Sequence, residues 1–310
     1  MKVLVTGASG LLGSHLAAAA IAEGHDVVAQ SRHRELAQSD SPRLHRERAD
    51  LANGDEVARL LDRWKPDGVF HVAARIPVDA SEHDPFTFFD DNVRATLNLL
   101  HAATRIGVKR FILSSTLSVY GTPQYLPVDE SHPLEPETAY GLSKLEGEGY
   151  GRLYSARSAM RVTVLRYSGI YGKGQQRGAI PAFIGRCAAN EPLILHADGR
   201  QSSDFVWVED AARANLLALE ADHLPRFAVF NIGSGIEITI AELANRIREL
   251  CGSSSELRPT GQSCGRDFRF VFDIEKARKT LGYLPTAQDQ ALARCLAQWV
   301  DGEWFGSGSR

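Results

Sequence analysis

Three glycines near the start of the chain constrain its fold more than any other feature. Gly7, Gly10 and Gly13 follow a short aliphatic run at residues 3–5 and precede a stretch rich in alanine and leucine at residues 11–22. In the order strand, turn and helix, such glycines let the backbone approach a pyrophosphate, whose charge then lies on the helix N-terminus. Their spacing of three and three differs from the G-x-G-x-x-G of ordinary dinucleotide folds. The motif therefore predicts a dinucleotide site at the first strand and helix.

Strand and helix patterns alternate through the first half of the chain. The predicted strands are residues 2–5, 26–30, 68–72, 110–113 and 161–166, and the predicted helices are 11–22, 54–64, 86–106 and 140–159. This alternation predicts an α/β fold, a Rossmann-like doubly wound parallel sheet with helices on both faces. After about Gly172 the alternation loosens. We therefore expect an NAD(P)-binding domain at residues 1–172 and a smaller C-terminal α/β substrate lobe at 173–303, with some segments returning to the first domain. Residues 304–310 are expected to be a tail.

Composition excludes several classes of protein. The 310 residues carry a formal net charge of −3 and are 44% apolar, which gives no electrostatic footprint for nucleic acid or for an anionic membrane. No apolar run reaches membrane-spanning length, and no signal peptide precedes the first strand, so a cytoplasmic location is expected. The four cysteines lack C-x-x-C spacing, so no metal site is expected.

Tyr140 and Lys144 form a Y-x-x-x-K pair at the start of a predicted helix. Positions i and i+4 share one helix face, so both side chains can point into the same crevice. A tyrosine with its ordinary pKa near ~10 is a poor base at neutral pH. We expect a neighbouring ammonium to lower that pKa and to make Tyr140 a general acid/base. Lys144 can also hydrogen-bond the ribose of a nicotinamide cofactor.

Several polar residues stand where predicted strands end. Gly7, His71, Ser114 and Arg166 are expected to converge on one crevice, because ligands of parallel sheets bind at the carboxyl ends of the strands. The run from Ser114 to Thr116 is rich in hydroxyl groups, which either donate to a substrate oxygen or cap their own backbone. His71 is interpreted as a structural residue near the cofactor and not as a proton donor.

Beyond the glycine and Y-x-x-x-K motifs, ordered matches run along the chain. They are F-H-V-A-A at 70–74, N-V-R-A-T at 92–96, S-S-T-L-S-V-Y-G at 114–121, L-R-Y-S-G-I-Y-G at 165–172, D-F-V-W-V-E-D at 204–210, F-N-I-G-S at 230–234 and D-I-E-K-A-R at 273–278. With these motifs the chain resembles the extended short-chain dehydrogenase/reductases of the NAD(P)-dependent epimerase/dehydratase family, over about residues 1–300.

The resemblance implies roles for individual residues. Thr116, Tyr140 and Lys144 fall on the family's catalytic positions. The cofactor would contact Gly7, Ser9, Gly10, Leu11, Leu12 and Gly13 at the pyrophosphate, Ser31, Arg32, Asp50 and Leu51 around the adenosine, and Ala73, Ala74, Ser114, Tyr140 and Lys144 further along. Asn92 also counts among these cofactor-binding residues and falls where the family places a helix-positioning asparagine. The resemblance also implies a homodimer, formed by the helices that hold Asn92 and Tyr140.

One departure from the family concerns the choice of cofactor. Ser31 stands where an NAD enzyme usually has an acidic residue that binds the ribose hydroxyls and repels a 2′-phosphate. Arg32 follows directly, with Arg34 close behind, and a guanidinium suits a phosphate through its charge and fork geometry. Unless these arginines belong to a solvated loop, the sequence mildly favours NADP over NAD.

Other departures concern the substrate. Nucleotide-sugar enzymes of this family usually have Asn where Gly169 stands, Arg where Ser203 stands and another Arg near Cys264. Arg177, Arg200 or Arg266 could substitute from a shifted position. The candidate substrate-binding residues are Arg75, Ser115, Gly169, Arg177, Arg200 and Arg266. A 4,6-dehydratase is disfavoured, because Leu117 and Ser118 replace the acid and base that water elimination needs.

Three functions remain open from the sequence. The leading one is NAD(P)-dependent oxidoreduction at a secondary alcohol or ketone of a nucleotide-linked sugar, by an epimerase or a keto-sugar reductase. The second is an NADPH-dependent reductase of a non-sugar aldehyde or ketone. The third, a non-catalytic NAD(P) sensor, would have no need of Thr116, Tyr140 and Lys144 together.

Overall fold

A seven-stranded parallel sheet forms the centre of the computed structural model, which describes residues 1–33, 41–76, 82–261 and 268–300. The strand order is β11-β6-β5-β4-β1-β2-β3. The strands are β1 (Lys2–Thr6), β2 (Asp26–Ser31), β3 (Leu44–Arg48), β4 (Gly68–His71), β5 (Arg110–Thr116), β6 (Arg161–Tyr167) and β11 (Phe227–Ile232). All five predicted strands are present, and β5 runs three residues further than expected, to Thr116. Polar β3 has no sequence signal, because it is an edge strand with no fully buried residue.

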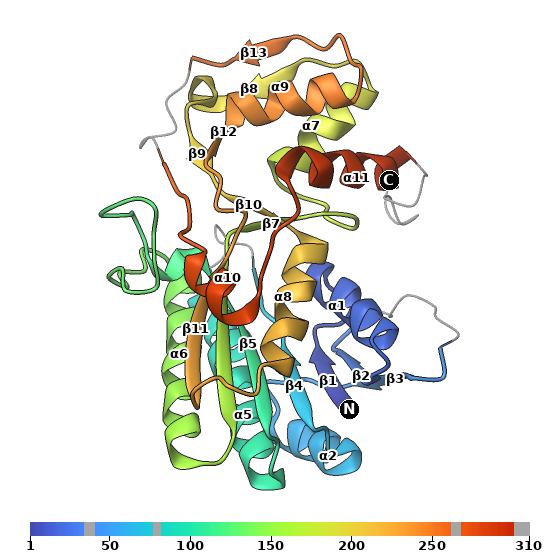
Figure 1. Ribbon diagram of the computed structural model, residues 1–310, viewed down its shortest axis with the longest axis vertical. Helices are drawn as coiled ribbons and strands as arrows, with labels where there is room; N and C mark the ends of the chain where they lie inside the picture. The colour runs from blue at the N-terminus through green and yellow to red at the C-terminus, as the bar shows by residue number, and fades with distance from the viewer. Residues whose placement is uncertain (34–40, 77–81, 262–267, 301–310) are drawn as a thin grey trace.

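Helices cover both faces of this sheet (Figure 1). On one face α1 (Leu11–Ala22) packs against α8 (Val208–Glu220), which comes from the C-terminal half of the chain. On the other face lie α2 (Gly54–Trp64), α5 (Ala95–Ile106) and α6 (Ala139–Arg157). Each layer buries its own apolar cluster against the strands, so the core has two parts separated by the sheet. The predicted doubly wound fold is confirmed.

The stretch predicted as one helix at 86–106 is divided into three. It consists of α4 (Pro85–Phe88), the π-helix η1 (Phe89–Arg94) and α5. A π-helical turn widens the backbone spacing from i→i+4 to i→i+5, and such turns occur often at functional sites. The spacing of hydrophobic residues in the sequence gives no sign of a π-helical segment this short. Asn92 lies within this π-helical turn and is buried.

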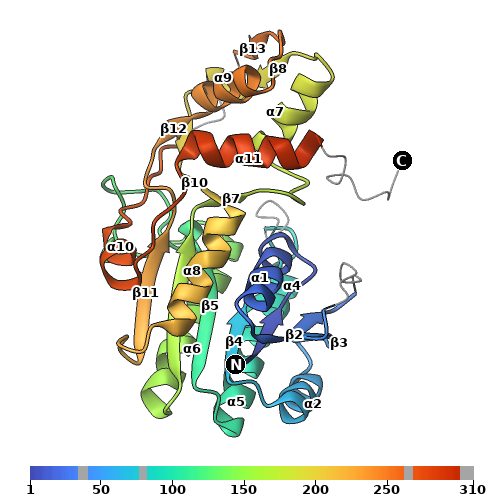
Figure 2. The same cartoon turned by 45° about the vertical axis from the view of Figure 1, so that its right-hand side comes forward.

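The C-terminal segments gather beyond the carboxyl edge of the sheet, above it in Figure 1 and Figure 2. They include α7 (Ala179–Ala188), β8 (Leu193–Leu195), α9 (Ile240–Leu250), β13 (Leu257–Pro259) and α11 (Gln288–Val300). The short pairs between the two parts are β7 (Gly169–Tyr171) with β10 (Phe205–Trp207) and β9 (Ser202–Ser203) with β12 (Ile238–Thr239). The 3-10 helices η2 (Leu117–Val119) and η3 (His196–Gly199) and the helix α10 (Glu275–Leu281) complete the elements. Both α8 and β11 return to the main sheet, and the domain boundary at residue 172 stays a prediction.

Among the residues that the structure describes, no helix has both the length and the apolar character needed to cross a bilayer.

Candidate active site

The glycine turn between β1 and α1 is built for a close backbone approach. Gly7 has a φ of +64°, and a Cβ there would lie 2.7 Å from Ala73 Cα. A Cβ on Gly13 would collide with the carbonyl of Gly7. Gly10 caps α1 without any side-chain hydrogen bond, and the first turn of the helix holds no acidic residue. A Cβ on Gly10 would meet only Gly7 O, at 3.2 Å. The open N–H groups at this helix end therefore fit a pyrophosphate.

Two side chains that the sequence analysis missed hold this turn in place. Gln30 on β2 accepts a hydrogen bond from Gly7 N at 3.0 Å and donates to Ala49 O at 2.6 Å. Thr6 Oγ1 accepts hydrogen bonds from the backbone N–H of Val72 and Ala73, each at 3.1 Å. The sequence signal for Gln30 was a glutamine that directly follows the apolar residues 27–29 of the same strand. The glycine turn is thereby fixed to β2 and to the end of β4 together.

His71 is a neutral structural residue, as the sequence suggested. Burial lowers its pKa to about 3. Thr96 Oγ1 donates to Asn92 O at 2.5 Å and therefore accepts from His71 Nε2, 2.9 Å away. His71 Nδ1 then accepts from Thr6 Oγ1 at 2.9 Å. The ring thus joins β1 to α5 and has no free nitrogen with which to transfer a proton.

The catalytic candidates lie where β5 ends and α6 begins. Thr138 caps α6 by accepting from Gly141 N at 3.0 Å, which fixes the first turn that carries Tyr140. Tyr140, Lys144 and Thr116 are all buried, and Thr116 Oγ1 accepts from Ser118 N at 3.2 Å. The structure therefore brings this predicted set together, on an i, i+4 helix face beside the end of β5.

The pKa values of this pair differ from the sequence-based expectation. Burial raises the pKa of Tyr140 above its ordinary value, and a hydrogen bond with the Thr116 side chain opposes that rise. Burial lowers the pKa of Lys144 to about 8, against the opposing charge of Glu148. The expected net lowering of the Tyr140 pKa is therefore wrong, because desolvation by burial is the largest influence on both groups.

Asn92 connects the π-helix to α6. Its Nδ2 donates to Ser143 Oγ at 2.9 Å and to Arg75 O at 3.2 Å, while its Oδ1 accepts from Arg75 N at 2.8 Å. Ser143 in turn donates to Tyr140 O at 2.8 Å. This asparagine therefore contacts the helix that carries Tyr140 and Lys144 rather than an open crevice.

A buried ionic network lies under α6, one turn beyond Lys144. Arg166 binds both carboxylate oxygens of Glu148, at 3.0 and 2.6 Å, and donates to Tyr120 Oη at 2.8 Å. Ser115 Oγ donates to Glu148 at 2.5 Å, so its hydroxyl has a different partner from the substrate oxygen that was expected. The expectation that Arg166 lines the crevice is also wrong, because its side chain is buried against α6.

The adenosine end of the predicted cofactor site is more polar than the sequence indicated. Ser31 is buried at the end of β2, and Arg32 extends to Asp91 on η1. Asp50, two residues after the end of β3, donates its backbone N–H to Glu56, and Leu51 is buried beside it. Among the other cofactor candidates, Ser9, Leu11, Ala73 and Ala74 are half-buried, and Leu12, Gly13 and Ser114 are buried. Arg34 lies outside the described residues.

The substrate candidates are only partly accounted for. A Cβ on Gly169 would lie 3.0 Å from the Phe205 ring, so a larger side chain at this position would require a small shift of that ring. Arg75 contacts Asp91, Arg177 is exposed on the loop after β7, and Arg200 lies 3.9 Å from Asp198. Ser203 is half-buried on β9. Cys264 and Arg266 lie outside the described residues.

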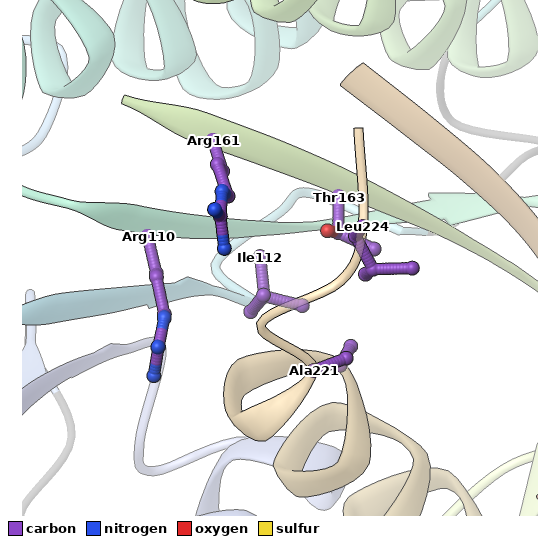
Figure 3. A pocket seen from close by; sticks show the side chains of 7 residues that line it. Arg110, Ile112, Arg161, Thr163, Ala221 and Leu224 are labelled. Carbon is purple, nitrogen blue, oxygen red and sulfur yellow. The ribbon is translucent and has the colours of Figure 1, made fainter. Parts of the chain in front are cut away.

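Two cavities lie away from Thr116, Tyr140 and Lys144 and from the substrate candidates. A cavity of about 10 Å³ at the start of β5 and β6 is lined by Arg110 and Arg161, which flank it in Figure 3. Both arginines pair with Asp222. A larger one, of about 310 Å³, lies between α6 and β11, with Arg166 and Glu148 in its wall. In the described part of the chain, no group of three or more metal-ligating side chains is placed to hold an ion.

Comparison with known proteins gives a consistent result. Residues 3–233 match the family described as the NAD dependent epimerase/dehydratase family. The chain is 34% identical to a putative UDP-glucose 4-epimerase of Methanocaldococcus jannaschii, over 96% of this chain and 98% of that protein. It is similar to the UDP-glucose 4-epimerase of Thermotoga maritima solved with UDP-glucose (29% identity, TM-score 0.88, covering 97% of this chain and 99% of that one). The Thermus thermophilus UDP-glucose 4-epimerase in complex with NAD is also similar (28% identity, TM-score 0.86, covering 97% and 100%). This chain belongs to the NAD-dependent epimerase/dehydratase family.

Proposed function

We propose that this protein is a nucleotide-sugar 4-epimerase that works with a bound NAD and acts on a UDP-hexose. The observation that carries the proposal is the placement of Thr116, Tyr140 and Lys144 at the carboxyl edge of the sheet that also carries the uncapped glycine turn. The relatives named above are UDP-glucose 4-epimerases, which supports the same substrate class.

In this proposal NAD, when bound, supplies the acceptor and donor of a hydride. Tyr140 removes the proton from the substrate hydroxyl as hydride leaves the same carbon, and gives the proton back to that oxygen when hydride returns to the opposite face of the carbon. Thr116 donates a hydrogen bond to the same substrate oxygen. Lys144, whose pKa burial lowers to about 8, hydrogen-bonds the nicotinamide ribose, and its ammonium form favours the phenolate of Tyr140. Burial of all three excludes water from the reacting oxygen.

Two features support epimerisation over the alternatives. Leu117 and Ser118 form the 3-10 turn directly after Thr116, so no carboxylate stands there to eliminate water. Arg32, the residue on which a preference for NADP was based, is paired with Asp91. That preference therefore stays a prediction, and we propose NAD, the cofactor named for the Thermus protein. A reductase of a non-sugar carbonyl compound remains the second candidate, because Gly169 and Ser203 stand where the resemblance places an asparagine and an arginine that bind a nucleotide diphosphate.

The proposal includes a homodimer. Large apolar side chains are exposed on the helices that would form it: Phe86 (84% exposed), Phe89 (52%) and Leu142 (50%) on α4, η1 and α6. Exposed aromatic and aliphatic groups of this kind mark protein contact surfaces. In the same reading, the C-terminal segments beyond the sheet bind the nucleotide and the sugar.

The test is conversion of UDP-glucose by the purified protein with no added cofactor. We expect UDP-galactose to appear by NMR up to equilibrium, without net change in nicotinamide absorbance, and Tyr140→Phe to stop the reaction. Consumption of added NADPH by keto compounds, without sugar epimerisation, would instead identify a reductase. Cofactor binding without turnover on a panel of UDP and dTDP sugars would favour a sensor.

A further inference from the structure

The guanidinium of Arg32 is already occupied by a carboxylate. Arg32 Nη1 lies 2.6 Å from Asp91 Oδ1 and Nη2 lies 3.2 Å from Oδ2, so the pair is bidentate. Asp50 contributes a weaker contact at 3.8 Å. Because Arg32 directly follows β2, its side chain stands where a dinucleotide places the ribose of its adenosine. A 2′-phosphate on that ribose would have to compete with Asp91 for the same fork of N–H donors.

Asp91 is held from its other side as well. Arg75 Nε and Nη2 both lie 2.7 Å from Asp91 Oδ2. Only 12% of the Asp91 side chain is exposed, against 35% for each arginine. The carboxylate is thus clamped between two guanidinium groups and cannot turn away from Arg32. Together Arg32, Arg75, Asp91 and Asp50 carry no net charge, so this edge offers little attraction to an additional phosphate.

We propose that Asp91 is a specificity-determining residue that makes the site select NAD over NADP. Ser31 has no charge with which to repel a 2′-phosphate, and Asp91 fills that role from a different element, the π-helix η1. It does so by sequestering Arg32, the cation that directly follows β2, and by adding a negative charge there. This inference rests on the proposed dinucleotide site, and it names the residue that sets the choice between the two cofactors.

Competitive loading of the purified protein tests the proposal. The protein is equilibrated with equal concentrations of NAD and NADP, free cofactor is removed, and the bound fraction is released by denaturation and quantified. Asp91→Asn keeps the shape of the side chain but loses its charge and one acceptor. We expect it to raise the ratio of bound NADP to NAD roughly tenfold to a hundredfold, the range for one charge-assisted contact. Asp90→Asn is the matched control, since Asp90 lies next in the chain and pairs with Arg94 at 3.0 Å.

Two further variants separate the possible outcomes. Adding Arg32→Ala to Asp91→Asn should abolish the gain in NADP binding, because the freed guanidinium is its source. Arg75→Gln, which leaves Asp91 to Arg32 alone, should move the ratio further toward NAD and does not depend on Asp91→Asn folding. An unchanged ratio in both Asp91→Asn and Arg75→Gln would overturn the role of Asp91. Failure of the wild type to retain either cofactor would instead contradict the proposed function.

Discussion

Asn92 Nδ2 donates a hydrogen bond to Ser143 Oγ across 2.9 Å, joining the π-helix to the first turns of the helix that carries Tyr140. Both residues are buried, and Ser143 passes the contact on to the backbone carbonyl of Tyr140 at 2.8 Å. The same asparagine binds the backbone N–H and C=O of Arg75. One side chain therefore fixes α6 relative to the segment after β4, which passes beside the glycine turn.

Asn92→Ala should lower both stability and turnover. It removes the acceptor of the Arg75 backbone N–H and the donor to Ser143 Oγ, which keeps only its bond to Tyr140 O, at about 1–3 kcal/mol of unfolding free energy. Because α6 is then less well positioned, we expect kcat to fall more than KM rises. Asn98→Ala is the control: Asn98 donates to the carbonyls of Leu51 and Ala52, so it shares the chemistry but does not contact α6. Urea unfolding and steady-state kinetics measure the two effects, and equal losses of kcat in both variants would contradict a positioning role.

Tyr140→Phe should lose turnover while cofactor content stays normal. Phenylalanine keeps the buried ring and removes only the hydroxyl that would transfer the proton. General acid/base catalysis contributes at least ~10²-fold, so kcat should fall by that factor or more. Tyr150→Phe, on the same helix, should leave kcat near the wild-type value. Near-normal activity of Tyr140→Phe would rule out the proposed proton transfer.

The parts of this protein that could be predicted from its sequence are those determined by neighbouring residues. Gly7, Gly10 and Gly13 follow their strand within a few positions, and Tyr140 and Lys144 share one helix turn, so their spacing carried the geometry. The five central strands were recognisable because they are buried runs of aliphatic residues. Their neighbour β3 was not, because only one side of an edge strand needs to be apolar.

The contacts that could not be predicted join residues far apart in the chain. Arg32 and Asp91 are 59 positions apart, and Ser115 and Glu148 are 33 apart. Nothing in the local sequence pattern distinguishes Asp91 from its neighbour Asp90. In the structure, however, Asp90 pairs with the exposed Arg94. The direction of the Tyr140 pKa was also wrong, because desolvation depends on how deeply the fold buries the phenol.

Lys144→Met should stabilise the protein at neutral pH. Folding lowers the pKa of Lys144 from 10.5 to about 8, so between these values the unfolded chain binds a proton that the folded one does not. The free energy of unfolding therefore rises with pH across this window. Below pH 8 the buried ammonium of Lys144 destabilises the folded protein to its full extent. Its size is roughly 3 kcal/mol, since each pKa unit corresponds to about 1.4 kcal/mol.

Unfolding by urea between pH 7 and 10 checks this expectation. The advantage of Lys144→Met over the wild type should shrink as the pH rises from 8 toward 10.5. Lys279→Met is the control, because its exposed side chain only pairs with Glu275 at 3.4 Å. A constant difference across the pH range would mean that packing, and not the buried charge, distinguishes the variant. Activity should be lost all the same, as expected where function requires a destabilising group.

Glu148→Gln should be the most destabilising of these substitutions. It leaves the guanidinium of Arg166 buried without its charge partner, and breaking a buried ion pair in this way costs about 3–5 kcal/mol. It also removes the charge that opposes the lowering of the Lys144 pKa, so that pKa should fall below about 8. Glu146→Gln is the matched control, two residues earlier on the same helix and exposed, where a change within about 0.5 kcal/mol is expected.

A double variant distinguishes the unpaired charge from a general loss of packing. In Glu148→Leu with Arg166→Leu neither charge remains, and apolar replacement of a buried pair is often neutral. We therefore expect the double variant to unfold at a higher urea concentration than Glu148→Gln, with a pH dependence of stability that still shows Lys144. If the double variant is the less stable of the two, the Ser115 and Tyr120 hydrogen bonds to this pair, rather than its charge balance, hold β5 and β6 to α6.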